Sequence, residues 1–595
     1  MRLSYPRTPH LPWSPGATPD DARAAGVSGL VGREVVVTEK LDGENTTLYR
    51  DGLHARSVDS AHHPSRAWTR ALHGRIAHAL PPGRRVCGEN LYARHSIAYT
   101  DLDSWFYAFS VWDGEHCLDW DATVRFARRL GVPVPPVLWR GVFDERALRA
   151  LRLDTARQEG YVVRTVEGFR RDEFAHRVAK WVRPGHVRTG EHWMSAPVVA
   201  NGLGRGAALW EVRSGAEPDA AALLAALDLA AADLCGPATA TPGDVARAEA
   251  AAADAAARLD LLGRTGDARL AGVLAALFHR ARRAWLAPRL ADRLGPRLAR
   301  RTADLVGLHG LLHRDLPDEK RRTGLARMSE AADLGVLHAL AAAALTGRDD
   351  AEAREARDRV AWSELHAEDA GLLGETPLEG VRARLREEFV HGDPDVADRC
   401  WAEARRALAE GRITTAEEAV ALTWRWRGAA FCHLVVTVGP SGSGKSTFAR
   451  SLPGVCVTVS LDELRRGRGS RADQSANRTV LGEGLRRLDT ALSDTSHDGC
   501  TVVWDATALN RHQRFLVHAV ARRRDALVTH AVWLLDEDTL ARRNVERRHP
   551  VPPEVLADQV RRYEPPYPGE AHRTWYVGAD GGVRDTAGVL DGEED

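Results

Sequence analysis

A glycine-rich turn between a strand and a helix constrains the fold of this chain more than any other feature. The stretch VVTVGPSGSGKSTFAR begins as an apolar strand, passes through the pattern G-x-x-x-x-G-K-S from Gly439 to Ser446, and continues as a helix. The backbone N–H groups of such a turn and the N-terminus of its helix form a cradle for phosphate. The turn therefore predicts an α/β domain with a parallel sheet.

The rest of the chain differs in composition from region to region. Residues 1–195 contain tryptophans and short apolar runs, such as VVVTE, WFYAFSVW and GYVVRTV, which predict strands. Residues 196–428 are rich in Ala, Leu and Arg with helical periodicity. Residues 429–595 alternate strands and helices. We predict three domains: an α+β domain at 1–195, an all-α domain at 196–428 and an α/β domain with a parallel sheet at 429–595.

Charge and cysteine content limit the classes of function. Lys plus Arg equal Asp plus Glu at 82 each in 595 residues, so any nucleic-acid site must be a local patch. The seven cysteines contain no C-x-x-C pair, which argues against a zinc ribbon and a disulfide framework. The first residues lack the apolar core of a signal peptide, and no run of 18 apolar residues is found. We expect a cytoplasmic protein without a membrane segment.

A lysine at the end of a predicted strand is the second candidate site. In VVVTEKLDGENTTLYR, Lys40 precedes the Asp42-Gly43 turn. A nucleophilic lysine must be neutral, so burial or nearby positive charge has to lower its pKa from about 10.4. An ordinary surface hairpin would give the same four letters, KLDG, and further motifs are needed to decide.

Those motifs follow in order: Arg56 in ARSV, Glu89 in CGEN, Phe109 in an aromatic strand, Glu159 in EGYVVR and Lys180 in VAKWVRP. With KLDG they resemble the covalent nucleotidyltransferases, and most closely the nick-joining phage-type RNA ligases. The resemblance covers about residues 30–190 and implies an ATP-grasp-like nucleotidyltransferase fold.

The resemblance also implies roles. Lys40 would attack the α-phosphorus of ATP to form a lysyl-adenylate, and Phe109 would stack on adenine. Glu39 and Glu89 would contact the nucleotide, Arg56 and Lys180 its phosphates, and Glu159 would bind Mg²⁺, with Mn²⁺ as a substitute. Lys180 would also lower the pKa of Lys40. Plain core packing is the alternative for Phe109. The family pattern is incomplete, because Val178 and Ser110 stand where a lysine and an aspartate are common.

The acceptor side of the glycine-rich turn suggests what receives the phosphate. Asp462 follows the next strand, with Arg465 three residues on, and Asp505, Arg511 and Arg514 follow a third. Arg543 and Arg547 are spaced one helical turn apart. This set resembles the polynucleotide 5′-kinases over about residues 430–570. The alternatives are a small-metabolite kinase and, for Arg543 and Arg547, a solvated helix face.

The resemblance to polynucleotide kinases implies a role for each of these residues. Lys445 would reach the β- and γ-phosphates, and Asp462 would take the proton of the acceptor hydroxyl. The residues expected to bind nucleotide are Gly439, Gly442, Gly444, Lys445, Ser446, Thr447, Arg543 and Arg547, and Ser446 would also bind Mg²⁺. The residues expected to bind the acceptor are Arg465, Arg511 and Arg514.

The middle region carries weaker signals. Arg289, Arg293, Arg297 and Arg301 recur every four residues, which predicts one guanidinium row along a helix. A solvated face paired with acids is the alternative. HGLLHRDLPDEKRR faintly resembles HD phosphohydrolases, but Arg314 separates His313 from Asp315, so we expect no metal site there. We expect a helical appendage that helps to hold RNA.

Together the motifs predict an RNA end-healing and sealing enzyme. Its kinase would use ATP or GTP to phosphorylate 5′-OH ends, and its ATP-dependent ligase would join 5′-phosphate to 3′-OH ends. Two alternatives stay open: a ligase whose glycine-rich domain phosphorylates another acceptor, and a nucleic-acid-binding repair scaffold without ligation.

Overall fold

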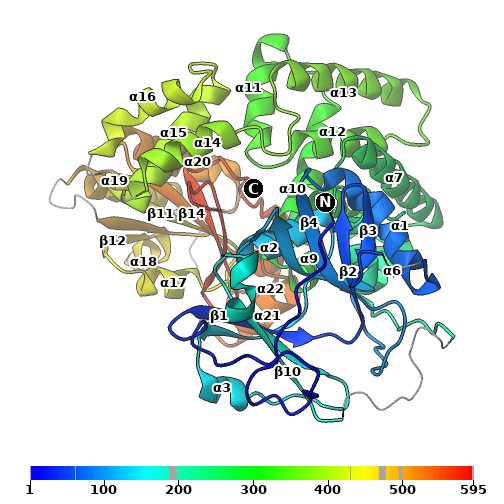
Figure 1. Cartoon of the computed structure of the whole chain (residues 1–595). Helices are drawn as coiled ribbons and strands as arrows, with labels where there is room; N and C mark the ends of the chain where they lie inside the picture. The colour runs from blue at the N-terminus through cyan, green and yellow to red at the C-terminus, as the bar shows by residue number, and fades with distance from the viewer. Residues whose placement is uncertain are drawn as a thin grey trace. The chain divides into compact units, whose positions relative to one another are not determined.

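The structure is a computed structural model that describes residues 2–59, 62–185, 197–390, 392–428, 431–467, 477–494, 500–547 and 549–592. Contacts sort the chain into two compact units (Figure 1). The first contains Met1–Ala231 and Ala252–Val273, and the second Ala232–Ala251 and Leu274–Asp595. The predicted division into three domains stays a prediction. None of the described helices combines the length and apolarity that crossing a bilayer requires.

Two antiparallel sheets form the first unit. One has the order β10 (Val178–Val182), β8 (Gly160–Thr165), β1 (Glu34–Lys40) and β7 (Val137–Val142). The other has the order β3 (Gly52–Ala55), β2 (Glu44–Tyr49), β4 (Arg84–Asn90), β5 (Phe106–Asp113), β6 (His116–Cys117) and β9 (Phe169–Arg170). All three strand runs singled out in this region of the sequence are therefore strands.

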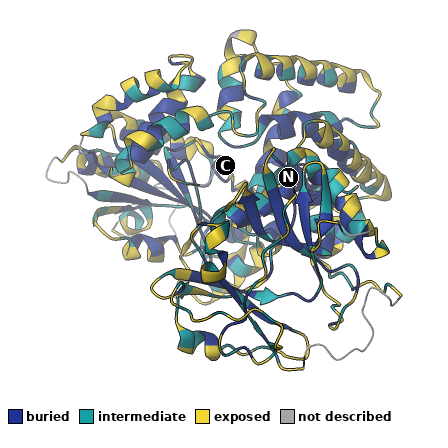
Figure 2. Ribbon diagram, in the orientation of Figure 1, coloured by how far each residue is buried: buried dark blue, intermediate teal, exposed yellow. Residues whose placement is uncertain are grey.

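Alternation of side chains builds separate cores around these sheets. Val35 and Val37 of β1 pack into a cluster with Tyr161 and Val163 of β8. The second sheet packs against α1 (Ala67–Ile76) and α2 (Trp120–Leu130), among others through Leu72. Most residues of β1, β4 and β5 are buried, whereas β7 is half-buried or exposed, and the outer faces of the helices are exposed (Figure 2). The central strands are thus rigid supports for the residues at their ends.

The C-terminal sheet has the order β12 (Val455–Ser460), β13 (Thr501–Asp505), β11 (His433–Val438), β14 (Leu527–Val532), β15 (Arg573–Val577) and β16 (Val583–Ala587). It is parallel except for β16. Apolar clusters cover both of its faces, as a parallel sheet requires. The α/β domain with a parallel sheet is confirmed.

Around this sheet lie α17 (Lys445–Ser451), α18 (Leu461–Arg466), α19 (Asn477–Ser493), α20 (Arg511–Arg523), α21 (Glu537–Val545) and α22 (Pro553–Arg562). The strand order places β11 between β13 and β14. Because β12, β13 and β11 are parallel, their carboxyl ends lie at the same edge of the sheet.

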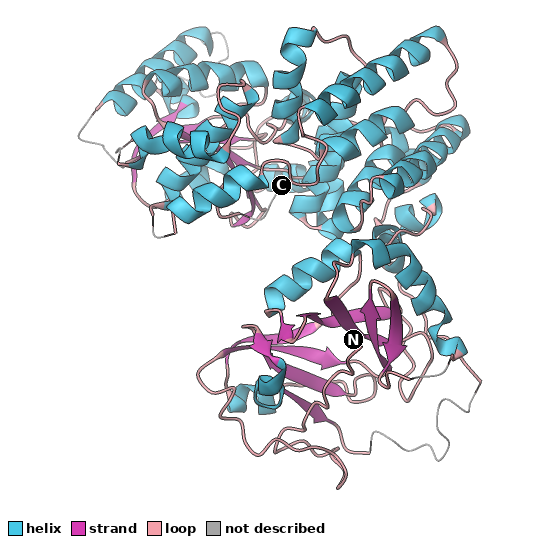
Figure 3. Ribbon diagram, turned by 45° about the horizontal axis from the view of Figure 1, so that its top comes forward, coloured by secondary structure: helices cyan, strands magenta, loops and turns pink. Residues whose placement is uncertain are grey.

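In the sequence between β10 and β11, the regular elements of the described residues are helices, as Figure 3 shows. They are α5 (Ala207–Arg213), α6 (Ala220–Ala226), α7 (Pro242–Leu261), α8 (Gly266–Leu277), α9 (Arg283–Leu294), α10 (Pro296–Leu312), α11 (Asp318–Ser329), α12 (Leu334–Ala343), α13 (Ala351–Asp369), α14 (Glu379–Glu388), α15 (Pro394–Ala409) and α16 (Ala416–Arg427). The helical middle region is confirmed.

The predicted arginine row is wrong as one continuous helix face. Gly295 has φ +79° and ends α9, and Pro296 begins α10. Glycine accepts this backbone conformation and proline suits the first turn of a helix, so the row is divided between two helices. Arg289 also folds back on its own helix, where its guanidinium lies 4.3 Å from the Trp285 ring.

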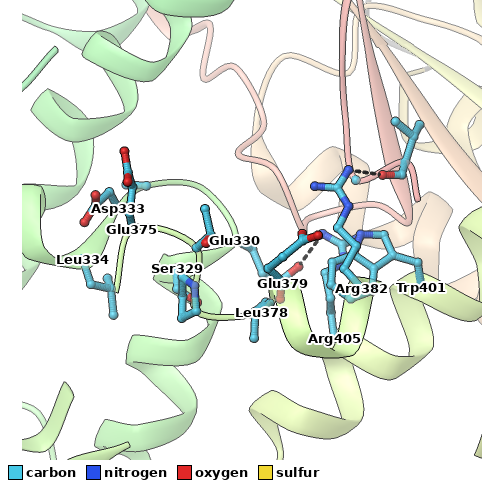
Figure 4. Close-up of a pocket in the computed structure, with 15 residues that line it drawn as sticks. Ser329, Glu330, Asp333, Leu334, Glu375, Leu378, Glu379, Arg382, Trp401 and Arg405 are labelled. Atoms are coloured by element: carbon cyan, nitrogen blue, oxygen red, sulfur yellow. Dashed lines mark hydrogen bonds and ion pairs between the residues drawn. The ribbon is translucent and has the colours of Figure 1, made fainter. Parts of the chain in front are cut away.

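Buried arginines of the middle helices bond to residues near the C-terminal end of the chain and to neighbouring helices. Arg382 of α14 donates to the carbonyl oxygens of Leu590 and Val589, at 3.0 and 2.9 Å. Arg405 of α15 pairs with Glu330 at 3.1 Å. These side chains line a cavity of about 70 Å³ (Figure 4), and both guanidinium groups are bonded to other groups of the protein. This cavity lies where the helices pack against residues near the C-terminal end of the chain.

One pair of cysteines differs from the expectation. Cys456 in β12 and Cys500 before β13 are joined by a disulfide, while the other five are free. Parallel neighbours in a sheet brought them together although 44 residues separate them in sequence. Sequence spacing alone gave no sign of this pair.

Candidate active sites

Lys40 lies in a cavity of about 630 Å³ in the first unit. The predicted residues Glu39, Arg56, Glu89, Phe109 and Lys180 line the same cavity. They come from β1, β4, β5 and β10 and from the end of β3, so side chains spread over 140 residues of sequence meet here. A cavity of this size can enclose a nucleotide.

The sheet register places Lys40 beside its main partner. Lys40 is opposite Gly160 in β8, so Glu159 lies at the adjacent strand end. The Lys40 Nζ donates to Glu159 Oε2 at 2.5 Å, and Glu159 is 5 % exposed. The buried pair fixes the ammonium at one point of the cavity.

The two residues of the turn have structural duties. Asp42 Oδ2 accepts from the backbone N–H groups of Ser96 and Ile97 at 2.8 and 2.9 Å. A Cβ on Gly43 would lie 2.5 Å from the carbonyl oxygen of Asn90, so β4 approaches too closely for any other residue. The pattern KLDG is therefore required by the packing around Lys40 as well as by its chemistry.

The pKa of Lys40 is raised, whereas the sequence led us to expect a lowered one. Burial lowers it, but the carboxylates of Glu159, Glu89 and Asp42 together outweigh burial. The pKa of Lys180 is lowered instead, by burial first and by the positive charge of Lys40 second. The acidic neighbours of Lys40 thus favour its charged ammonium form.

The carboxylates around Lys40 fit a divalent cation. The pKa of Glu89 is raised to about 8, chiefly by burial; the charges of Glu159 and Asp42 contribute to this rise and that of Lys40 opposes it. No three His, Cys, Asp or Glu side chains among the described residues form a metal cluster by themselves. Oxygen ligands of this kind suit Mg²⁺ or Mn²⁺, which take further ligands from phosphate and water.

An N-terminal segment completes the cavity. Tyr5, Pro6 and Thr8 line it, and the Tyr5 ring meets the edge of Phe109 at a centroid distance of 5.1 Å. His10 forms a parallel bridge with Lys180. Sequence reasoning missed this segment, whose only signals are closely spaced prolines and a tyrosine in SYPRTPHLPW. Phe109 is half-buried, so one part of its ring still faces the cavity.

The glycine-rich turn of the second unit has the expected backbone. Gly439, Gly442 and Gly444 all have positive φ, at 159°, 87° and 102°. Lys445 opens α17 with its Nζ 2.5 Å from the Pro440 carbonyl oxygen and 3.2 Å from Ser443 Oγ. Thr447 is the third residue of the helix and is exposed. The turn is closed around its own lysine.

Neighbouring strand ends bring two acids to this turn. Ser446 Oγ donates to Asp505 Oδ2 at 2.8 Å, and Arg465 pairs with Asp462 at 2.6 Å. Burial lowers the pKa of Lys445 to about 8, partly opposed by Asp505. Burial also raises the pKa of Asp505. A hydroxyl and a carboxylate side by side fit Mg²⁺ beside a bound nucleotide.

The two arginines proposed as a clamp are placed differently from each other. Arg543 of α21 donates from Nη1 to the Ser443 carbonyl oxygen at 3.2 Å, so it touches the turn. Arg547 lies two residues beyond the end of α21 and is exposed, and its charge helps to lower the pKa of Lys445. They do not share one helix face, because α21 ends at Val545.

The structure gives Arg514 a structural position. It is 2 % exposed, and its Nε and Nη2 donate to both oxygens of Glu570 at 2.7 and 3.0 Å. Its Nη1 donates to two backbone carbonyl groups. These bonds occupy the guanidinium, so Arg514 holds α20 in place. Arg511, at the start of α20, is exposed.

Two family models match separate stretches of the chain. Residues 33–182 match the RNA ligase family model, and residues 434–566 match an AAA domain model. A gluconokinase structure from Sinorhizobium meliloti aligns with 25 % of this chain and 85 % of its own, at 23 % identity and a TM-score of 0.20. No curated protein matches the sequence.

An RNA ligase mutant from Naegleria gruberi, solved with ATP and Mn, aligns with 26 % of this chain and 51 % of its own. The identity is 17 % and the TM-score 0.21, and this chain spans about half the length of that ligase. The family models show that the chain joins an RNA ligase domain to a kinase-like P-loop domain.

Proposed function

We propose that this protein heals and seals RNA ends. Its P-loop domain phosphorylates a 5′-OH end with ATP or GTP, and its ligase domain joins the resulting 5′-phosphate to a 3′-OH end. The observation that supports this most is that one chain holds both a buried Lys40–Glu159 pair in a nucleotide-sized cavity and a complete phosphate turn.

The ligase step begins at Lys40. Its neutral amine attacks the α-phosphorus of ATP, a N–P bond forms, the bond to the β-phosphate oxygen breaks, and pyrophosphate leaves. The ion pair with Glu159 opposes this step, because it keeps the amine protonated. Glu159 would hold a divalent cation, which would neutralise its charge, and burial and the positive charge of Lys180 favour the neutral amine of Lys40. Phe109 and Glu89 hold the nucleoside, and Arg56 holds a phosphate.

The kinase step transfers the γ-phosphoryl group to the RNA hydroxyl. Asp462 accepts the hydroxyl proton as the new O–P bond forms. Lys445 and Arg543 stabilise the charge on the transferring group. Arg465, held by Asp462, and Arg511 bind the phosphates of the acceptor strand. Ser446 and Asp505 would hold a divalent cation, which would supply further stabilisation of the charge on the phosphates.

The experiment uses one RNA duplex nick in two forms, with a 5′-OH and with a 5′-phosphate. Wild-type protein should take up label from α-labelled ATP, transfer label from γ-labelled ATP or GTP to the 5′-OH form, and seal both forms. If the protein seals the phosphorylated form but transfers no γ-label, the ligase assignment stands and the polynucleotide kinase assignment is wrong. The absence of α-label would favour a scaffold that no longer adenylates.

A further inference from the structure

A second large cavity lies in the helical part of the second unit. Its volume is about 420 Å³, and it shares no lining residue with the phosphate turn. The lining combines three arginines with three histidines: Arg247, Arg280, Arg348, His279, His309 and His313. They come from α7, the end of α8, α10 and the segment after α12, so four separate parts of the chain converge.

The three imidazoles share one arrangement. His279 and His309 each place Nδ1 2.8 Å from the carbonyl oxygen three residues earlier, and His313 places Nε2 2.8 Å from that of Ala341. A carbonyl only accepts, so each of these nitrogens carries the hydrogen. Burial lowers the pKa of His309 to about 4 and lowers that of His279. The other ring nitrogen of neutral His279 and of neutral His309 is therefore a hydrogen-bond acceptor.

The described residues that line the cavity include three arginines and no acidic side chain, because the carboxylate partners of the arginines lie outside the lining. The single carboxylate of Asp244 pairs with both Arg247 and Arg280. The two guanidinium side chains are 52 % and 46 % exposed, so each can also turn toward a ligand. Arg348 is paired with Asp350 and Glu352 at 3.0 and 3.2 Å and is 40 % exposed.

An anion fits this cavity better than a metal ion. The charges of Arg280 and Arg247 both act to lower the pKa of His279. The ring centroids are 6.4 Å apart for His279 and His309 and 5.7 Å for His309 and His313. Across the part of the chain that the structure describes, no cluster of metal-ligating side chains is found. Guanidinium groups recognise phosphate, and acceptor nitrogens recognise hydroxyl groups.

We propose that this cavity binds a ribose monophosphate, with the arginines on the phosphate and the imidazole nitrogens accepting from sugar hydroxyls. The volume is within the range of small-molecule sites. The ligand could be a free nucleotide or the phosphorylated end of an RNA strand, since both present the same group. The proposal does not depend on what the P-loop domain phosphorylates.

Calorimetry on the full chain tests it, with a non-hydrolysable ATP analogue and Mg²⁺ saturating the two nucleotide sites. The probes are uridine 3′-monophosphate, uridine, inorganic phosphate, and short RNAs with a 3′- or 5′-phosphate. Uridine 3′-monophosphate should bind, and Arg280→Gln and Arg348→Gln should each weaken it about 10-fold or more. Arg354→Gln is the matched control, because Arg354 is exposed and outside the cavity, and should change binding less than about 2-fold.

Further measurements distinguish the histidine contacts from the arginine contacts, and a free nucleotide from an RNA strand end. His309→Asn should weaken the nucleotide more than inorganic phosphate, because it removes a hydroxyl acceptor. Tighter binding of RNA than of the nucleotide identifies a strand end, and equal binding identifies a free nucleotide. No nucleotide or RNA binding by wild-type protein would overturn the proposal. So would unchanged binding in both arginine variants, or stoichiometric Zn²⁺ binding that is lost in His309→Asn.

Discussion

The two lysines of the candidate active sites have opposite surroundings. Lys40 is paired with the carboxylate of Glu159, and its pKa is raised. Lys445 is bonded to a carbonyl oxygen and a hydroxyl, and burial lowers its pKa to about 8. Lys445 is buried and Lys40 is half-buried, and burial acts to lower the pKa of both, so the charge of the nearest oxygen decides the direction of the shift.

This difference between the two lysines indicates how each site would respond to its ligand. In the proposed mechanism the nucleophile, Lys40, stays charged until its carboxylates are neutralised, which ties its reactivity to the binding of nucleotide and cation. Lys445 lacks a full counter-charge until phosphates arrive. Each site is thus completed by its ligand, in one case by releasing the lysine and in the other by pairing with it.

The largest effect is expected from Lys40→Ala. A phosphoramide bond needs the amine, so the acid-labile AMP label on the chain should be lost completely, while γ-transfer to 5′-OH RNA should be unchanged. Denaturing gels with α-labelled ATP measure this. Lys40→Arg is the matched control, because it keeps a cation beside Glu159 and should also take up no label. Label on either variant would assign the nucleophile elsewhere.

Next in size are Lys445→Ala and Asp462→Asn. Phosphorylation of 5′-OH RNA should fall by about 10²–10⁴-fold for loss of the base Asp462. Sealing of RNA that already carries a 5′-phosphate should continue in both. Lys445→Ala should raise the KM for nucleotide, whereas Asp462→Asn should mainly lower kcat. If Asp462→Asn keeps wild-type kcat, another group accepts the proton.

The stability of the two sites should depend on pH in opposite directions. A folded-state pKa near 8 for Lys445, against an ordinary 10.5, means that its charge opposes folding at neutral pH, by up to about 3 kcal/mol. Lys445→Met should therefore raise the melting temperature at pH 7, and the gain should shrink as the pH rises from about 8 to 10.5.

For Lys40 the sign is reversed. Its raised pKa stabilises the fold fully below its ordinary pKa, and this contribution is lost as the pH rises through the folded-state value. Lys40→Met should lower the melting temperature of the first unit at pH 7, because Glu159 is left buried without its partner. Scanning calorimetry at several pH values checks both variants. Equal shifts of the same sign would remove the contrast between the sites.

The smallest effect on stability is expected from Arg465→Gln. Its partner Asp462 is 61 % exposed, and exposed ion pairs contribute about 0–1 kcal/mol. Unfolding should therefore be nearly unchanged, while the KM for 5′-OH RNA should rise several-fold. A change in stability without a change in KM would make Arg465 a structural residue. Steady-state kinetics and thermal melts on the same samples decide.

Much of the fold could be predicted because local pattern and tertiary structure agree. Apolar runs such as that of β1 are strands, and three glycines with positive φ are where the phosphate motif requires them. Lys40, Phe109 and Lys180 share a cavity because strand register converts motif order into proximity. These features depend on short stretches whose neighbours are fixed by sheet topology.

The features that the sequence did not predict depend on partners that are distant in sequence. Arg514 and Arg511 look alike after a strand end, yet Glu570, over 50 residues away, binds one of them inside the fold. The raised pKa of Lys40 needs three acids from three strand ends. The cavity of His279 and His309 required four converging segments. No periodicity carries this information.

The bonds between the helices and the C-terminal sheet bear on how such a gene can be rearranged. Arg399 of α15 donates to the carbonyl oxygens of Asp525 and Ala526 at 3.1 and 2.8 Å, and Arg382 reaches Leu590. A recombination breakpoint just before β11 would respect the sequence motifs but would strip these acceptors of their donors. We expect the helices from α9 onward to be inherited together with the P-loop domain, as one exchangeable module.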